Sequence, residues 1–77
     1  MIKTTFYTTV ENQLRADGSR GLLYDHFEDE NQAYAKYFTI SAAAAVSEIP
    51  YHAAHLIRSD GLMIEGRVWD RRQEENG

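Results

Sequence analysis

The sequence contains no cysteine among its 77 residues. Neither a disulfide framework nor a thiolate metal site can therefore hold the fold together, and the absence is typical of a reducing compartment. A chain of this length buries only about 60% of the surface that it exposes when unfolded. We therefore expect the fold to depend on the packing of a helix against a sheet or on self-association, with little volume left for a deep pocket.

Long apolar runs are absent as well. No stretch approaches the roughly 20 residues of a membrane-spanning helix. The N-terminal residues alternate between polar and apolar types, whereas a signal peptide would show a charged start followed by an apolar segment. We therefore expect a soluble, cytoplasmic protein.

Basic residues are few: eight Lys and Arg stand against twelve Asp and Glu, for a formal net charge of −4. The acids are concentrated at Asp25, Glu28, Asp29 and Glu30. Because the sequence predicts a helix start at this point, these carboxylates would complement the positive end of the helix dipole. The alternative is an acidic patch that meets a basic partner.

Proline occurs once, at Pro50. Asp29, with Gln32 three places later, has the spacing of a capping box, and Pro50 cannot continue a helix. The sequence therefore predicts a helix from Asp29 to Ser47 or Glu48. The side chains on its predicted core face are Ala33, Tyr34, Tyr37, Phe38, Ile40, Ser41, Ala44 and Ala45.

Two similar segments, Arg15–Gly18 and Arg58–Gly61, flank this predicted helix. Each contains an Asp-Gly pair between strand-like runs, which favours a tight hairpin because Gly tolerates positive φ. The expected strands span residues 2–11, 22–27, 51–58 and 62–70. The predicted fold is a two-layer α+β sandwich of ββαββ order, with one antiparallel sheet of about four strands and one helix across one face. We assign residues 1–70 to this single domain and residues 71–77 to a disordered tail.

A single helix covers one face of a sheet, so the other face is a candidate binding surface. Strand alternation predicts Tyr7, Arg67 and Trp69 on that uncovered face. The opposite alternation places Phe6, Val10, Ile64 and Val68 against the helix. Aromatic and arginine side chains on an open sheet serve base stacking or protein contacts, although cross-strand packing alone also explains them.

The outer face of the predicted helix is the second candidate surface. Ala35, Thr39, Ala42 and Val46 share this face, where a solvated helix normally carries charged residues. Small side chains allow another backbone to approach closely, but alanine is also simply the best helix former. This surface, or the strand edges, could support a symmetric dimer.

Residues that carry catalytic or metal chemistry form no recognisable motif. His52 and His55 are three apart, and on a strand such residues lie on opposite faces and cannot chelate one ion. His26 beside Asp25 has no nucleophile predicted nearby. We therefore predict no catalytic residue, no metal site and no cofactor.

The segments Ala33–Phe38 and Ile49–Ile57 resemble short bacterial proteins carried on mobile or conjugative elements. The resemblance covers roughly residues 20 to 72 and brings no known activity with it. It implies a bacterial accessory protein that acts by binding. We expect a non-enzymatic protein whose partner is a protein or a second copy of itself. The alternative is a nucleic-acid-binding module that uses Tyr7, Arg67 and Trp69, which the negative net charge disfavours.

Overall fold

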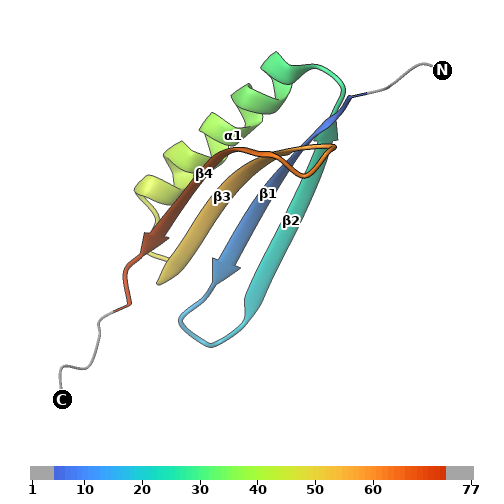
Figure 1. Cartoon of the computed structure of the whole chain (residues 1–77). Helices are drawn as coiled ribbons and strands as arrows, with labels where there is room; N and C mark the ends of the chain where they lie inside the picture. Colours follow the sequence, from blue (N-terminus) through green and yellow to red (C-terminus); the bar gives the residue numbers. More distant parts are fainter. Residues whose placement is uncertain (1–4, 73–77) are drawn as a thin grey trace.

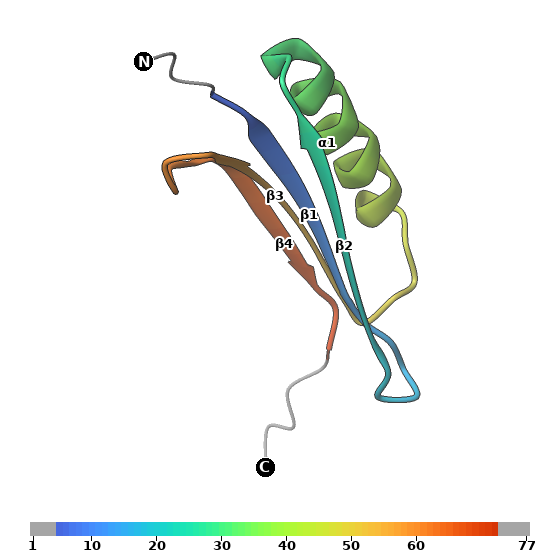
Figure 2. The same ribbon diagram turned by 90° about the vertical axis from the view of Figure 1, so that its right-hand side faces the viewer.

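The computed structural model describes residues 5–72 and confirms the predicted fold class (Figure 1). Its elements are β1 (Tyr7–Leu14), β2 (Arg20–Phe27), α1 (Glu30–Ala45), β3 (Tyr51–Arg58) and β4 (Met63–Asp70). The strands form one antiparallel sheet in the order β2-β1-β3-β4. Helix α1 lies along one face of this sheet, as the view from the side shows (Figure 2).

Both Asp-Gly hairpins form as the sequence predicts. The backbone N–H of Gly18 donates to the carbonyl of Arg15 at 2.9 Å, and that of Gly61 donates to the carbonyl of Arg58 at 2.8 Å. The two glycines have φ values of 88° and 92°, a region that L side chains rarely adopt. The first turn joins β1 to β2 and the second joins β3 to β4.

Helix α1 begins where the sequence predicts and ends earlier. The Asp29 carboxylate caps it by accepting a hydrogen bond from the backbone N–H of Asn31 at 2.8 Å. The helix ends at Ala45, short of the predicted Ser47 or Glu48. At this end Arg71, from the end of the sheet, bonds two of the last helical carbonyls: its Nη2 donates to that of Ala44 at 2.6 Å and to that of Ala45 at 2.9 Å.

Arg71 and Arg72, the first two residues of the predicted tail, contact the rest of the domain. The backbone N–H of Arg71 donates to the carbonyl of Pro50 at 2.6 Å. The Arg72 guanidinium lies over the Tyr51 ring at 5.0 Å and bonds the Asp70 carboxylate. The remainder of the predicted tail, residues 73–77, lies outside the described residues.

Replacing Arg71 with alanine should lower the free energy of unfolding by about 1.5–3 kcal/mol. The substitution removes a charged donor from helix-terminal carbonyls that α1 cannot satisfy internally. Urea denaturation followed by circular dichroism measures this loss. Arg72→Ala is the matched control, because the contacts of Arg72 with the Asp70 carboxylate and the Tyr51 ring lie at the surface and should contribute less than about 1 kcal/mol. Equal losses for the two variants would contradict the role given to Arg71.

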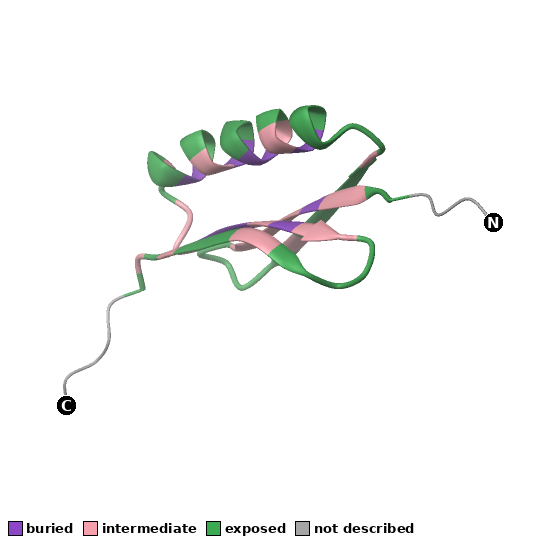
Figure 3. Ribbon diagram, turned by 45° about the horizontal axis from the view of Figure 1, so that its top comes forward, coloured by how far each residue is buried: buried purple, intermediate pink, exposed green. Residues whose placement is uncertain are grey.

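The core lies between α1 and the centre of the sheet (Figure 3). The buried face of α1 presents Ala33, Tyr37, Ile40 and Ala44. The first three of these pack against Ala54 and Leu56 on β3. Two residues of the predicted core face, Phe38 and Ala45, are exposed. The Phe38 ring lies at the side of the helix against Tyr37, with the ring centroids 5.5 Å apart.

The predicted orientation of β1 is wrong. Tyr7 packs against the core, so the residues that alternate with it, including Thr9 and Glu11, also face α1. Val10 therefore lies on the opposite side, together with Phe6. Strand pairing places Thr9 beside Leu56 of the core, which agrees with this orientation.

Strand β4 changes face at a β-bulge. Its register against β3 shifts between Leu56 and Ile57, where Ile64 is inserted between the paired residues Met63 and Glu65. Ile64 packs toward the helix as predicted, but the inserted residue reverses the alternation beyond it. Val68, predicted to face the helix, therefore pairs with Ala53 on the uncovered side. Within residues 5–72, no helix is long and apolar enough to cross a membrane.

Candidate interaction surface

The sheet face turned away from α1 carries most of the exposed apolar strand residues; we call it the open face. Alternation and register assign four residues to it from each strand. From β1 and β2 these are Thr8, Val10, Asn12, Leu14, Arg20, Leu22, Tyr24 and His26. From β3 and β4 they are Tyr51, Ala53, His55, Ile57, Met63, Gly66, Val68 and Asp70.

Large apolar side chains stand half exposed on both outer strands of the open face. Leu22 is 51% exposed and Tyr24 is 56% exposed on β2, and Met63 and Val68 are similarly exposed on β4. On the two middle strands of the face, Val10, Ala53 and Ile57 lie among the polar residues Thr8, Asn12 and His55. Exposed apolar side chains gathered on one face mark interaction sites more often than isolated exposed residues do.

The helix-covered side of the sheet is more polar than a core side usually is. Thr9 and His52 are buried there, and Nε2 of His52 lies 2.6 Å from Oε2 of Glu11. Lys36 on the helix forms an ion pair with Asp25 of β2 at 3.5 Å. The chain thus places several polar side chains beneath α1 and leaves apolar side chains on the bare face. An antiparallel sheet with one face in water normally shows the opposite distribution, with apolar residues under the helix and polar residues on the open side.

The contact between Glu11 and His52 affects the acid side of the stability profile. Burial alone would raise the pKa of Glu11, but the hydrogen bonds from His52 and Gln13 outweigh it and leave the pKa below its ordinary value of 4.5. A carboxyl whose pKa is lower in the folded state stabilises the fold above its unfolded pKa. This contribution disappears as the pH falls through the folded value.

Glu11→Gln should therefore lower the free energy of unfolding by about 1–2 kcal/mol at neutral pH, because a charge-assisted hydrogen bond becomes a neutral one. The difference between variant and wild type should shrink as the pH falls below 4.5. Urea denaturation at a series of pH values from 7 to about 3 measures both effects. A difference that stays constant over this range would contradict a stabilising carboxylate at Glu11.

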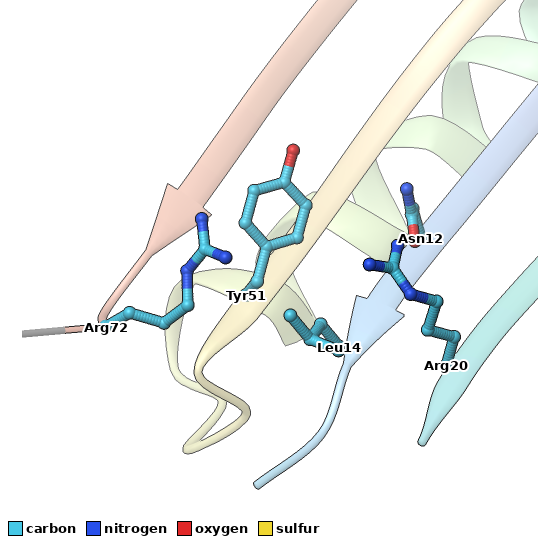
Figure 4. Close-up of a pocket in the computed structure, with 5 residues that line it drawn as sticks. All are labelled: Asn12, Leu14, Arg20, Tyr51 and Arg72. Carbon is cyan, nitrogen blue, oxygen red and sulfur yellow. The ribbon is translucent and has the colours of Figure 1, made fainter. Parts of the chain in front are cut away.

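A shallow hollow of about 120 Å³ lies at one end of the open face (Figure 4). Its lining comprises Asn12, Leu14, Arg20, Tyr51 and Arg72. Arg20 stands at the β2 side and Arg72 at the β4 side, with Leu14 and Tyr51 between them (Figure 4). Arg72 is held by Asp70, with Nη2 to Oδ2 at 2.7 Å. No ion pair joins Arg20 to a carboxylate in the part of the chain that the structure describes.

The predicted trio of Tyr7, Arg67 and Trp69 does not form a surface on the open face. Tyr7 packs against the core. Arg67 pairs with Ala54 and Trp69 pairs with His52, both on the helix-covered side of β3. The Arg67 guanidinium lies 5.1 Å from the centre of the Trp69 ring, so two of the three residues meet at the outer edge of the sheet. Their predicted placement is wrong because the bulge at Ile64 reverses the alternation of β4.

The second candidate surface is accessible as expected. Ala35, Thr39, Ala42 and Val46 are all exposed, although Val46 lies just beyond the last helical residue. Thr39 donates its hydroxyl to the carbonyl of Ala35 at 2.9 Å, which is a local helix contact. The role of this surface as an interface remains a prediction.

The acidic cluster and the histidines have local explanations. Asp29 caps α1 and Glu30 lies in its first turn, while Asp25 bonds Lys36. His52 faces the helix and His55 faces the opposite side, as their spacing on a strand requires. Among residues 5–72, no group of three or more His, Asp or Glu side chains is arranged to hold a metal ion.

Comparison with protein-family models, curated proteins and solved structures finds no match to this chain. Any role of the open face must therefore be inferred from its own residues.

Sequence reasoning missed Leu22 and Tyr24 on the open face because the adjacent Leu22 and Leu23 point to opposite faces and leave the register of β2 ambiguous. The hairpin resolves it: the tight turn pairs Leu14 with Arg20, which places Leu22 and Tyr24 on the open face.

Proposed function

We propose that this chain is a small, non-enzymatic accessory protein of the bacterial cytoplasm that acts by binding a protein partner through the open face. The observation that carries the proposal is the distribution of side chains on the sheet. Leu22, Tyr24 and Val68 stand half exposed on the bare side, while Glu11 and His52 lie under the helix. Such an apolar face is costly in water unless a partner covers it.

A protein partner agrees with these residues better than a nucleic acid does. Nucleic-acid binding depends largely on neutralising phosphates, whereas the chain has a net charge of −4. On the open face, the basic side chains Arg20 and Arg72 flank one end, and the exposed apolar side chains Leu22, Tyr24, Met63 and Val68 lie along the outer strands. Apolar and aromatic side chains at the centre with charges at the rim are typical of protein interfaces.

Site-specific photo-crosslinking in cells tests the proposal. A photoreactive amino acid at position 22 on the open face should capture protein, either another copy of the chain or a different protein. The same amino acid at position 42, exposed on the outer face of α1, is the matched control. We expect several-fold more crosslinked protein from position 22. Equal protein capture from the two positions, or nucleic acid captured from position 22, would contradict the proposal.

A further inference from the structure

We infer that the occupant of the open face is a second copy of this chain, with the two sheets face to face around a two-fold axis parallel to the strands. This inference rests on the proposed function, because it names the partner of the same surface. It joins the two sheets into a four-layer α/β/β/α sandwich in which each helix lies on the outside. Aligned packing of two twisted sheets, within about 30° of each other, is a common arrangement.

The available area matches a second copy that covers the entire face. Each strand has eight residues, which span about 27 Å, and four strands are about 19 Å wide. The flat area is therefore about 500 Å² per copy and about 1,000 Å² for the pair, at the lower bound of a specific interface. A partner that covered only part of this face would fall below that bound, whereas an identical sheet overlaps all of it.

The charges at one end of the open face favour a two-fold axis parallel to the strands over one perpendicular to them. Strand pairing places Arg20, Leu14, Tyr51 and Asp70 in one row across the sheet. Arg20 and Asp70 thus stand at opposite ends of that row. An axis parallel to the strands lays β2 of one copy over β4 of the other, so Arg20 of each copy faces Asp70 of the other. Each Asp70 carboxylate would then lie between two arginines, since it already bonds Arg72.

The outer strands also bring apolar side chains together in the next rows under this axis. Leu22 of one copy faces Val68 of the other, because both belong to the row of Asn12 and Ala53. Tyr24 faces Gly66, in the row of Val10 and His55. Tyr24 would there pack against the side chains of His55 and Met63, which lie over Gly66. In the hollow, Leu14 of one copy packs against Tyr51 of the other.

The perpendicular axis in the plane of the sheet gives a poorer match. It reverses the strand direction and lays β2 over β2, so that Arg20 faces His26 and Asp70 faces Met63 of the second copy. Arg20 would then meet no opposite charge, and desolvating an unpaired charge is unfavourable. The parallel axis is therefore the better arrangement for these residues.

A charge-exchange experiment tests both the dimer and its axis. Sedimentation velocity of the full chain at tens of micromolar should show a wild-type dimer. Arg20→Glu alone sets two carboxylates against each other at each contact, and Asp70→Arg alone sets two guanidinium groups against each other. Each variant should therefore dimerise at least about tenfold more weakly than the wild type.

An equimolar mixture of the two variants restores opposite charges at both contacts. The carboxylate introduced at position 20 of one chain faces the guanidinium introduced at position 70 of the other, and the unchanged Arg20 and Asp70 face each other at the second contact. Only this mixture should regain wild-type affinity, as a heterodimer.

Two further variants separate the possible failures. Leu22→Lys should give a monomer that keeps the far-ultraviolet circular dichroism spectrum of the folded chain, and Ala42→Glu on the outer face of α1 should leave the dimer intact. A wild-type monomer at all concentrations would overturn the inference, and the proposed function would still stand if position 22 crosslinks another protein. A dimer that the charge variants leave unchanged would overturn the axis. If Ala42→Glu dissociates the dimer, the interface lies on the outer face of α1, and the inference is overturned.

Discussion

Leu56→Ala is expected to lower the free energy of unfolding by about 2–5 kcal/mol. Leu56 is 0% exposed and is among the largest fully buried side chains. It packs on β3 beneath Tyr37 and Ile40 of the helix. A domain of this size has a total stability of roughly 4–12 kcal/mol, so this one substitution could remove a large part of it. Urea denaturation measured by circular dichroism gives the change directly.

The neighbouring Ile57 is the matched control for Leu56. It lies on the open face, where no helix covers it. Both alanine variants should be made in the Leu22→Lys background, so that a dimer does not bury Ile57. Ile57→Ala should then cost less than Leu56→Ala, about 1.5 kcal/mol, because Ile57 is only partly buried. Equal losses at positions 56 and 57 would mean that both faces of β3 are covered within one chain.

The second large effect is expected from placing a charge beneath the helix. Ala54 is 0% exposed and belongs to the core between α1 and the sheet. Ala54→Lys would bury an ammonium group without a carboxylate built to receive it, at a cost of several kcal/mol. We expect this variant to be unfolded at room temperature, with a circular dichroism spectrum that lacks the helical signal.

Ala53→Lys is the corresponding change on the other face. Ala53 is also 0% exposed, but only neighbouring side chains of the open face cover it. A lysine there can extend its stem across the apolar surface and keep its charge in water. This variant should stay folded and should lose the ability to dimerise. If Ala53→Lys unfolds the chain as completely as Ala54→Lys, the open face is not open in the monomer.

The sequence was sufficient to predict the element order because each signal is local. An Asp-Gly pair requires a tight turn, Asp29 supplies a helix cap, and Pro50 excludes further helix. The third strand was predicted at the residues where it occurs, Tyr51–Arg58. The contacts of Arg71 with the end of the helix could not be predicted, because Arg71 lies far along the chain from Ala44 and Ala45.

The identity of the covered face could not be predicted in the same way. A two-residue period shows that a strand has two faces, but both faces of β1 carry a large side chain, Tyr7 on one and Val10 on the other. Which face of the sheet the helix covers depends on the register of β1 with β3 and on the bulge at Ile64. Both are contacts between residues far apart in the sequence. Assigning the more apolar set to the helix was wrong because this sheet carries apolar side chains on its bare face.

An intermolecular nuclear Overhauser effect between Leu22 and Val68 is the most direct test of the account. Within one chain these residues lie on the two outer strands, β2 and β4, about 14 Å apart across three strand spacings. A mixed sample of isotopically labelled and unlabelled protein should show contacts between their methyl groups that arise only between copies. Intermolecular contacts confined to Ala35, Ala42 or Val46, or no contacts at millimolar concentration, would contradict the open face as the surface through which this protein binds its own copy.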